Sequence, residues 1–178
     1  MKKLIVGALV GGIILFLWQF FSWSFSGLHD SQMQYTANQE TIMEVLSENL
    51  EEGSYFLPTV PKGTSSADAQ AFMVESEGKP WATISYYESM ESNMGMNMFR
   101  GFVVDFISVW LLCWILLKFG NLTFSNALLS SLAVGLIGYL SINYINSIWF
   151  EGNTIADLID AVVSWGLIGA WLGWWLRR

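Results

Sequence analysis

Four long apolar runs dominate the pattern of hydrophobic and polar positions along this chain. They cover residues 4–25, 99–119, 124–145 and 155–176. Each run contains about 20 residues, which is the length that an α-helix needs to cross the hydrocarbon core of a bilayer. The pattern therefore predicts four transmembrane helices.

The first apolar run has the features of an uncleaved signal anchor, which we place at residues 1–27. Lys2 and Lys3 precede it. A cleaved signal peptide would have a shorter apolar core and small residues at its cleavage site. Bulky aromatic residues crowd the end of this run instead: Trp18, Phe20, Phe21, Trp23 and Phe25.

Residues 28–98 form a polar, acidic segment that we expect to fold as a small cap. Thr36 and Gln39 have the spacing of a capping box. An apolar stripe at helical spacing follows, and Gly53 is placed where this helix would end. The stripe consists of Ile42, Val45, Leu46 and Leu50. The segment therefore predicts a helix that begins near Thr36.

The second half of the cap predicts a loop, a helix and a strand. Residues 55–62 contain Pro58 and Pro61 and are expected to form a loop. Ser65 or Ser66 would then cap a short helix that runs toward Gly78. Residues 81–87 are rich in aromatic and β-branched side chains, which favour a strand. A domain of this size has a marginal core, so we expect the cap to lean on the membrane or on a partner.

These elements predict an all-α membrane protein, a four-transmembrane-helix bundle with a small α or α+β extracytoplasmic cap between helices 1 and 2. The cap covers residues 28–98, and residues 99–178 hold helices 2 to 4. The loops near Gly120 and Gly152 are short. Helices 2, 3 and 4 should therefore pack as sequential antiparallel neighbours.

The basic residues predict the orientation of the chain in the membrane. Lys and Arg gather in short cytoplasmic loops. With the N-terminus inside, five basic residues fall on the cytoplasmic side: Lys2, Lys3, Lys118, Arg177 and Arg178. Both termini would then be cytoplasmic, the cap would be extracytoplasmic, and the expected location is a bacterial cytoplasmic (inner) membrane.

The composition supports a lipid environment and excludes several kinds of chemistry. Hydrophobic residues make up 53% of the chain and charged residues only 13%, against about 25% charged in soluble domains. A single cysteine, Cys113, and a single histidine, His29, exclude a disulfide, a bis-histidine haem, a cysteine-rich zinc site and a Cys/His nucleophile pair. We therefore expect no cofactor. The acidic cap would repel phosphates, which argues against nucleic acid as a partner.

Polar residues cluster toward the outer ends of the predicted helices. The set comprises Arg100, Asp105, Asn143, Asn146, Glu151, Asp157 and Asp160. Ionisable residues at this depth are costly and are usually paired or functional. Three roles are open: a bundle-locking network with Arg100 as the cation, a contact with lipid headgroups or a partner, and an ion path. The inner halves of the helices lack acids and histidine, which argues against a proton pump.

A methionine run precedes the second apolar segment. Met94, Met96 and Met98 alternate with other residues. Thioether sulfurs suit Cu(I) outside the cytoplasm. The spacing resembles the methionine motifs of copper-transport and periplasmic copper-binding proteins, and this resemblance implies a weak metal site that His29 could complete. The alternative is that these flexible side chains seal the joint between cap and bilayer while Gly95 allows a turn.

Small residues recur at four-residue spacing in the predicted helices, where they allow helix backbones to approach closely. The glycines are Gly7, Gly11, Gly135, Gly138, Gly169 and Gly173. They predict helix seams, either within one chain or between chains.

The sequence predicts no specific catalytic activity. A nucleophile beside a base, a histidine metal site and a glycine-rich phosphate loop are all absent at convincing spacing. The preferred hypothesis is a non-enzymatic accessory, assembly or interaction subunit at the outer membrane–water junction, with the lipid bilayer and a membrane-protein partner or a second copy as contacts. The alternatives are a small ion or metal transporter, or a Cu(I)-handling protein, and thirdly a membrane enzyme.

Overall fold

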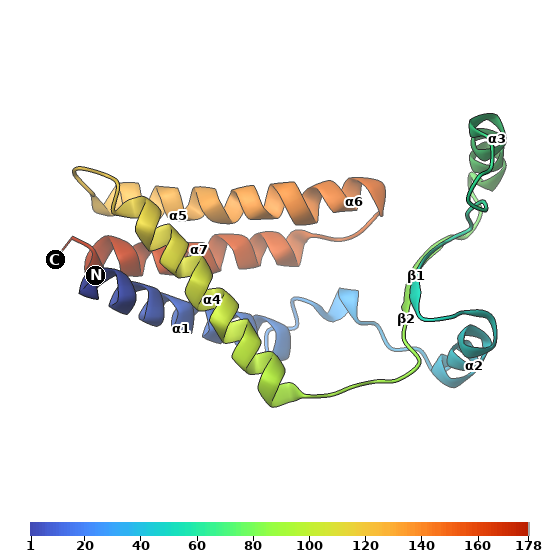
Figure 1. Ribbon diagram of the computed structural model, residues 1–178, viewed down its shortest axis with the longest axis horizontal. Coiled ribbons are helices and arrows are strands. Elements are labelled where there is room, and N and C mark those ends of the chain that lie inside the picture. Colours follow the sequence, from blue (N-terminus) through green and yellow to red (C-terminus); the bar gives the residue numbers. More distant parts are fainter. Residues whose placement is uncertain (178) are drawn as a thin grey trace. The chain divides into compact units, whose positions relative to one another are not determined.

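The computed structural model describes residues 1–177, and most of them are helical (Figure 1). Four helices are long and apolar enough to span a membrane, which confirms the number expected from the sequence. They are α1 (Lys2–Ser24), α4 (Met94–Leu116), the continuous helical segment Phe124–Trp149, and α7 (Ile155–Trp175).

The chain divides into two compact units. The helical unit comprises Met1–Gln34 and the chain from Asn93 onward, and the cap unit is Tyr35–Ser92. The short 3-10 helix η1 (Asp30–Gln32) follows α1 within the helical unit. Residues 28–34, which the sequence pattern had grouped with the cap, therefore pack with the helices.

The helices of the helical unit are not packed in their sequence order. Helix α1 packs against α4 and α7, and α7 packs against the helix that begins at Phe124. Helix α4 makes only slight contact with α5 (Phe124–Gly138), which corrects the expectation that helices 2 and 3 are neighbours, whereas helices 3 and 4 pack together as expected. In Figure 1, α4 crosses α1 and α7 obliquely. The short α4–α5 loop keeps only the adjoining ends of these two helices close. Side-chain fit along the helices therefore determines which helices pack together.

Close backbone approaches at glycine explain this choice of partners. A Cβ atom added at Gly12 would lie 3.0 Å from the Phe106 Cα, so α1 and α4 touch backbone to backbone. At Gly169, an added Cβ would lie 2.8 Å from the Ser131 Cβ across the α5–α7 seam. Gly7, Gly11, Gly135 and Gly173 are equally confined, whereas Gly138 has no atom near its missing side chain. Five of the six predicted glycines therefore lie at helix contacts within the chain. Gly12 lies at a further contact that the four-residue spacing did not predict.

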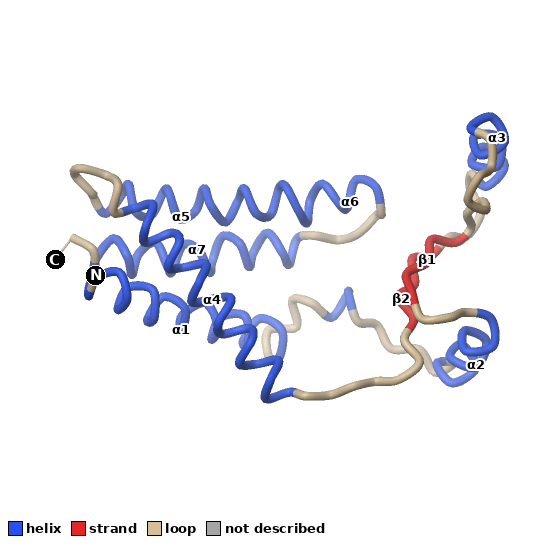
Figure 2. The backbone as a smooth tube through the Cα atoms, viewed as in Figure 1, coloured by secondary structure: helices blue, strands red, loops and turns tan. Residues whose placement is uncertain are grey.

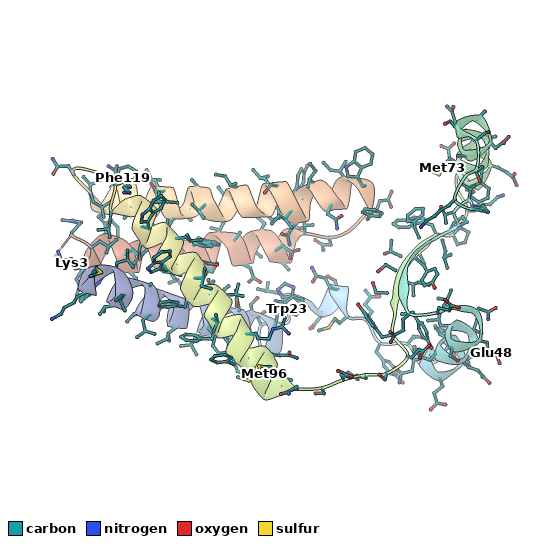
Figure 3. The ribbon with its side chains drawn as sticks, viewed as in Figure 1. Lys3, Trp23, Glu48, Met73, Met96 and Phe119 are labelled. Carbon is teal, nitrogen blue, oxygen red and sulfur yellow. The ribbon has the colours of Figure 1, made fainter. Side chains whose placement is uncertain are left out.

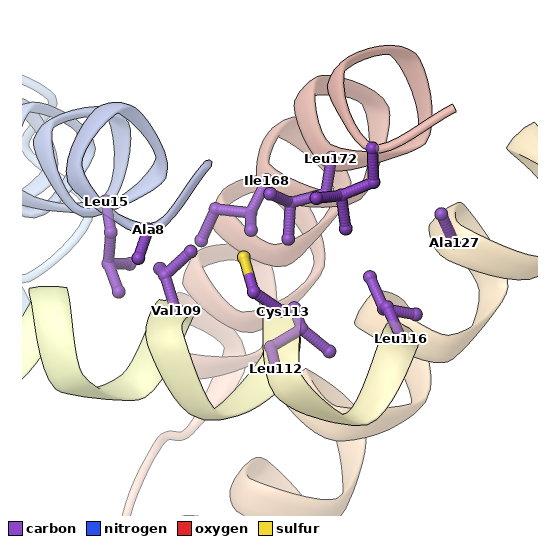
Figure 4. Close-up of a cluster of buried hydrophobic side chains, with 10 residues drawn as sticks. Ala8, Leu15, Val109, Leu112, Cys113, Leu116, Ala127, Ile168 and Leu172 are labelled. Carbon is purple, nitrogen blue, oxygen red and sulfur yellow. The ribbon is translucent and has the colours of Figure 1, made fainter. Parts of the chain in front are cut away.

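An apolar core fills the space where these helices meet (Figure 4). Its largest fully buried side chains are Leu112, Leu116, Ile168 and Leu172. Ala8 on α1 and Ala127 on α5 are also fully buried against it, because small side chains let these helices come close.

The third span is a composite helix. Helix α5 continues into the π-helix η2 (Tyr139–Tyr144) and then α6 (Ile145–Trp149). The Ser141 hydroxyl donates a hydrogen bond to the Ile137 carbonyl oxygen at 2.6 Å, a local contact that competes with the regular helical ladder. A π-turn changes the phase of the side chains that follow it, and such turns are frequent at functional sites.

The cap unit has an α+β fold. Helix α2 (Gln39–Asn49) is followed by strand β1 (Gly53–Leu57), helix α3 (Ser66–Ser76) and strand β2 (Ala82–Tyr86). The strands pair antiparallel, from Gly53 opposite Tyr86 to Leu57 opposite Ala82. The two helices are therefore attached to opposite ends of the ladder (Figure 2).

The structure confirms the second cap helix and the strand at residues 81–87, and it corrects two other predictions. The Ser65 hydroxyl accepts a hydrogen bond from the Asp68 backbone N–H, as expected for a helix cap. Residues 53–57 form β1, although we predicted a helix end at Gly53 and a loop from residue 55. Helix α2 begins at Gln39, with Asn38 at its N-cap in place of Thr36. Strand β1 was missed because its pairing partner is about 30 residues away in the sequence.

Candidate functional site: a buried polar cluster

The candidate site lies at one end of the helical unit. The Trp175 indole N–H donates to the Lys3 carbonyl oxygen at 2.8 Å, so the start of α1 and the end of α7 lie side by side. Polar side chains gather at the opposite ends of these two helices. We call this set the polar cluster: Trp18, Gln19, Ser22, His29, Gln32, Asp105, Asn143, Asp157 and Asp160.

Asp160 and His29 form the centre of the polar cluster. The Asp160 Oδ2 atom lies 3.0 Å from His29 Nε2. The other carboxylate oxygen, Oδ1, accepts a hydrogen bond from the Ser22 hydroxyl at 2.6 Å and one from the Trp18 indole N–H at 3.0 Å. Three side chains from α1 and the segment after it thus hold a carboxylate on α7.

A sharp turn after α1 brings His29 into this position. Gly27 has a φ angle of 69°, a left-handed conformation that glycine adopts without steric cost. The imidazole of His29 returns over the end of α1, stacks on the Trp23 ring at 3.9 Å and is only 3% exposed. Trp23 is labelled beside the segment that follows α1 in Figure 3.

Both ring nitrogens of His29 have polar partners. Its Nε2 atom faces the Asp160 carboxylate, which can only accept a hydrogen bond when ionised. Its Nδ1 atom lies 3.1 Å from Gln32 Oε1, also an acceptor. The orientation of the Gln32 amide is fixed because its nitrogen donates to Asp157 Oδ2 at 3.2 Å. Both ring nitrogens are therefore engaged, and the imidazole links Asp160 on α7 to Gln32 in η1.

Asp157 extends the network to the third span. Its Oδ1 atom accepts a hydrogen bond from the Asn143 amide at 2.9 Å. Asn143 belongs to η2, so the π-helical segment supplies the donor that links the third span to α7. A continuous chain of hydrogen bonds runs from Asp160 through His29, Gln32 and Asp157 to Asn143.

Asp105 on α4 lacks full hydrogen bonding. Its Oδ1 atom accepts from the Gln19 amide at 3.1 Å. Its Oδ2 atom is buried and has no hydrogen-bond partner among residues 1–177, and the residue is only 3% exposed. A buried polar atom without a hydrogen-bond partner costs free energy. Asp105 Oδ2 is the one side-chain oxygen of the polar cluster in this condition among residues 1–177.

A cavity of about 460 Å³ adjoins these groups. Asp105, Asp157 and Asp160 line it together with Asn143. Aromatic side chains complete the wall, with Trp18 from α1, Tyr139 from η2 and Trp165 from α7. The arrangement combines acidic oxygens with aromatic faces, a pairing suited to cations.

The structure brings together only part of the predicted polar set. Asp105, Asn143, Asp157 and Asp160 line one cavity. In the described part of the chain, the close pairs of basic and acidic side chains are His29–Asp160 and Lys79–Glu75, so the basic residue of the network is His29 and not Arg100. Arg100, Asn146 and Glu151 are exposed and contribute no side-chain hydrogen bond to the cluster.

Sequence reasoning missed several members of the polar cluster. Gln19 and Ser22 interrupt the apolar run of α1 with two polar side chains three residues apart, a spacing that places them on one helical face. This pair of polar residues could have been used to predict a polar face on the first helix. Gln32 had no comparable signal, because its role depends on the turn at Gly27.

The methionine run does not form a converging set. Met94 begins α4, so this run is helical and the span starts before the predicted residue 99. The Asn93 side chain caps the helix by accepting a hydrogen bond from the Met96 N–H at 3.1 Å. Successive alternate residues on a helix point to nearly opposite sides, so Met96 points away from the face shared by Met94 and Met98. His29 is engaged within the polar cluster, and no group of three or more metal-binding His, Cys, Asp or Glu side chains occurs in residues 1–177.

Comparison with protein-family models, with curated proteins and with solved structures finds no match for this chain. The functional argument therefore rests on the geometry of the polar cluster and of the cap unit.

Proposed function

We propose that this protein is a non-enzymatic interaction subunit of a membrane-protein assembly. In this proposal both termini face the cytoplasm of a bacterium, and the cap unit binds another membrane protein on the outer side of the cytoplasmic membrane. The observation that supports the proposal is the small core of the cap unit. Tyr86 is its one buried apolar side chain among residues 35–92.

The cap unit leaves most of its large apolar side chains exposed. On α2 these are Ile42, Met43 and Val45, and on α3 they are Met73 and Val74. In Figure 3, Met73 marks α3 and Glu48 marks α2, which belong to different ends of the ladder. A two-stranded sheet is marginally stable alone. A partner that covers the exposed apolar side chains of α2 would supply burial that this end of the ladder lacks.

One part of the cap surface is already concave. A groove of about 640 Å³ lies between α2 and the end of β2. Its walls include Met43 and Leu46 on α2 and Tyr86, Tyr87 and Met90 at or after β2. Methionine and tyrosine are favoured at protein interfaces because they combine large contact areas with adaptable or polar ends. We assign this groove as the docking site for the partner.

The charge of the cap unit defines the chemistry of that partner. Residues 35–92 carry ten Asp and Glu side chains and only two lysines. Glu52 and Glu91 lie at the groove itself. A second copy would bring like charges together, and anionic lipid surfaces would be repelled. The groove therefore suits a protein segment with an apolar centre and basic flanks.

Site-specific photocrosslinking in living cells would test this proposal. A photoreactive amino acid in place of Tyr87 lies in the groove, and the same amino acid in place of Val74 on α3 lies outside it. We expect Tyr87 to give one discrete adduct with another membrane protein and Val74 to give none. The adduct should weaken with Met43→Glu, and its yield should fall at high salt because the attraction is partly electrostatic.

Three outcomes would overturn the proposal. An adduct of twice the mass of the chain would identify a second copy as the occupant. Adducts with lipid alone would show that the cap leans on the membrane. Equal crosslinking from Tyr87 and Val74 would show that the groove has no special role.

A further inference from the structure

Asp105 carries a buried oxygen without a hydrogen-bond partner among residues 1–177, and it lines the cavity of the polar cluster. We propose that this cavity binds an organic ammonium group that carries at least one N–H, which donates a hydrogen bond to Asp105 Oδ2. This inference concerns the helical unit and is independent of the role proposed for the cap.

The charge balance of the polar cluster favours a cationic ligand. The cluster contains three carboxyl groups, and His29 is its one basic side chain among the described residues. The Nε2 atom of His29 already lies 3.0 Å from Asp160 Oδ2. Asp157 receives only neutral amide donors, from Gln32 and Asn143. A positive charge in the cavity would compensate the remaining carboxylates, which are costly to bury unpaired.

Arg100 does not supply this charge. It is exposed, and it precedes Asp105 by five residues on α4. Five residues advance a helix by roughly 140° beyond a full turn, so the two side chains point to different sides. Asp105 Oδ2 therefore stays without a hydrogen-bond partner among residues 1–177, and Asp105 lines the cavity.

The cavity lining favours an organic ammonium over a metal ion. Divalent metals require several converging oxygen or nitrogen ligands, and residues 1–177 contain no group of three or more ionisable ligands able to hold one. Trp165 and Tyr139 add aromatic faces, which attract organic cations. An orphan acceptor needs a hydrogen-bond donor, so an ammonium with N–H groups fits better than a quaternary one.

The position of the cavity is compatible with entry from the lipid. Its walls come from α1, α4, α5, η2 and α7. Because α4 makes only slight contact with α5, the third span and α4 do not close against each other along their length. A phospholipid with an ethanolamine headgroup could present its ammonium there, and a small free amine could supply the same group from water.

Lipid nanodiscs separate these possibilities. The purified full-length protein would be placed in phosphatidylcholine alone and in phosphatidylcholine mixed with phosphatidylethanolamine. Native mass spectrometry would count retained lipids, and thermal unfolding would report stabilisation. We expect about a tenfold preference for phosphatidylethanolamine, as one charge-assisted hydrogen bond provides. Asp105→Asn should abolish the preference, whereas Arg100→Gln should leave it unchanged.

A headgroup series tests the same idea in the unmodified protein, so it does not depend on whether a variant folds. Monomethyl and dimethyl phosphatidylethanolamine keep an N–H donor, and phosphatidylcholine has none. Binding should persist through the dimethyl headgroup and fall at the trimethyl one. Free ethanolamine added to phosphatidylcholine nanodiscs should stabilise the protein if a soluble amine is the natural source, and should leave it unchanged if the ligand is a lipid.

Several results would overturn the ammonium site. These are equal retention of all headgroups without an effect of free ethanolamine, and a preference that survives Asp105→Asn. Stabilisation by acidification alone, with no dependence on amine or headgroup, would show that Asp105 holds a proton instead.

Discussion

At the scale of single residues, the environment of Asp160 explains how a carboxylate is accommodated at the end of an apolar helix. His29, Ser22 and Trp18 all contact it within hydrogen-bond distance. The stacking of His29 on Trp23 fixes the imidazole plane. When one partner of a buried ion pair is removed, the other is left without a counter-charge. This loss costs more free energy of unfolding than the intact pair contributes.

The first prediction concerns this ion pair. Asp160→Asn should lower the free energy of unfolding by about 1–3 kcal/mol, since one oxygen is left for the three side chains that contact the carboxylate. Denaturant titration in micelles would measure the change. Glu75→Gln is the matched control, because it breaks the exposed Glu75–Lys79 pair, which spans 3.2 Å, and should cost less than about 0.5 kcal/mol. Equal effects of the two variants would contradict a structural role for the buried pair.

The second prediction compares two glycines in α5. An added Cβ at Gly135 would lie 2.7 Å from the Trp165 ring and 2.9 Å from the Ala161 carbonyl oxygen, whereas Gly138 has nothing within 4 Å. Gly135→Ala should therefore destabilise the protein by about 1–3 kcal/mol through overpacking of the α5–α7 seam.

Gly138→Ala is the control for this seam and should change the stability by less than about 0.5 kcal/mol. Thermal unfolding in the same detergent would compare the two variants. If both were equally destabilising, loss of glycine flexibility would explain the result better than helix contact.

At the scale of secondary-structure elements, two irregular segments create the polar cluster. The turn at Gly27 and helix η1 bring His29 and Gln32 back over the end of α1. The π-helix η2 carries Asn143, which donates to Asp157 on α7. Regular helices alone would have exposed these polar groups to lipid, where unsatisfied donors and acceptors are costly.

The third prediction concerns the cap of α3. The Ser65 hydroxyl accepts from the Asp68 N–H at 3.2 Å and donates to the Asp68 carboxylate at 2.7 Å. Ser65→Ala should destabilise α3 by about 1 kcal/mol. Hydrogen exchange would then be faster in residues 66–76 than in the unmodified protein.

Ser66→Ala is the matched control, because Ser66 is the first residue of the helix and does not cap it. It should leave exchange in α3 nearly unchanged. Faster exchange in both variants would indicate that the helix responds to any loss of a hydroxyl at its start.

At the scale of the whole molecule, the two units differ in how they are stabilised. The helical unit has an apolar core and close glycine seams. The cap unit has a two-stranded ladder and a single buried apolar side chain among the residues described. This difference is the physical reason to expect that the cap, and not the helices, depends on a partner.

The fourth prediction tests the proposed orientation. The chain has a single cysteine, Cys113, which is fully buried and should resist labelling in the folded protein. New cysteines can therefore be introduced at Ser66 in the cap and at Asn121 in the α4–α5 loop. A membrane-impermeant maleimide should label Ser66→Cys in intact cells and Asn121→Cys only after permeabilisation. The reverse pattern would invert the topology and place the cap in the cytoplasm.

Sequence alone was sufficient to predict the four long helices, because the length and apolarity of a span are properties of local composition. It also predicted a cap for α3 at Ser65 or Ser66, of which the structure shows Ser65, and the strand within residues 81–87. Glycines such as Gly11 and Gly169 marked the seams, since close helix contact requires small residues.

Tertiary structure decided which groups meet. Helix α1 packs with α4 and α7 because their side chains and glycine surfaces fit together. Strand β1 forms only because β2 pairs with it. His29, and not Arg100, is the basic residue of the polar cluster because the turn at Gly27 brings it back over α1. These contacts join residues far apart in the chain, and hydrophobic periodicity carries no information about such long-range pairing.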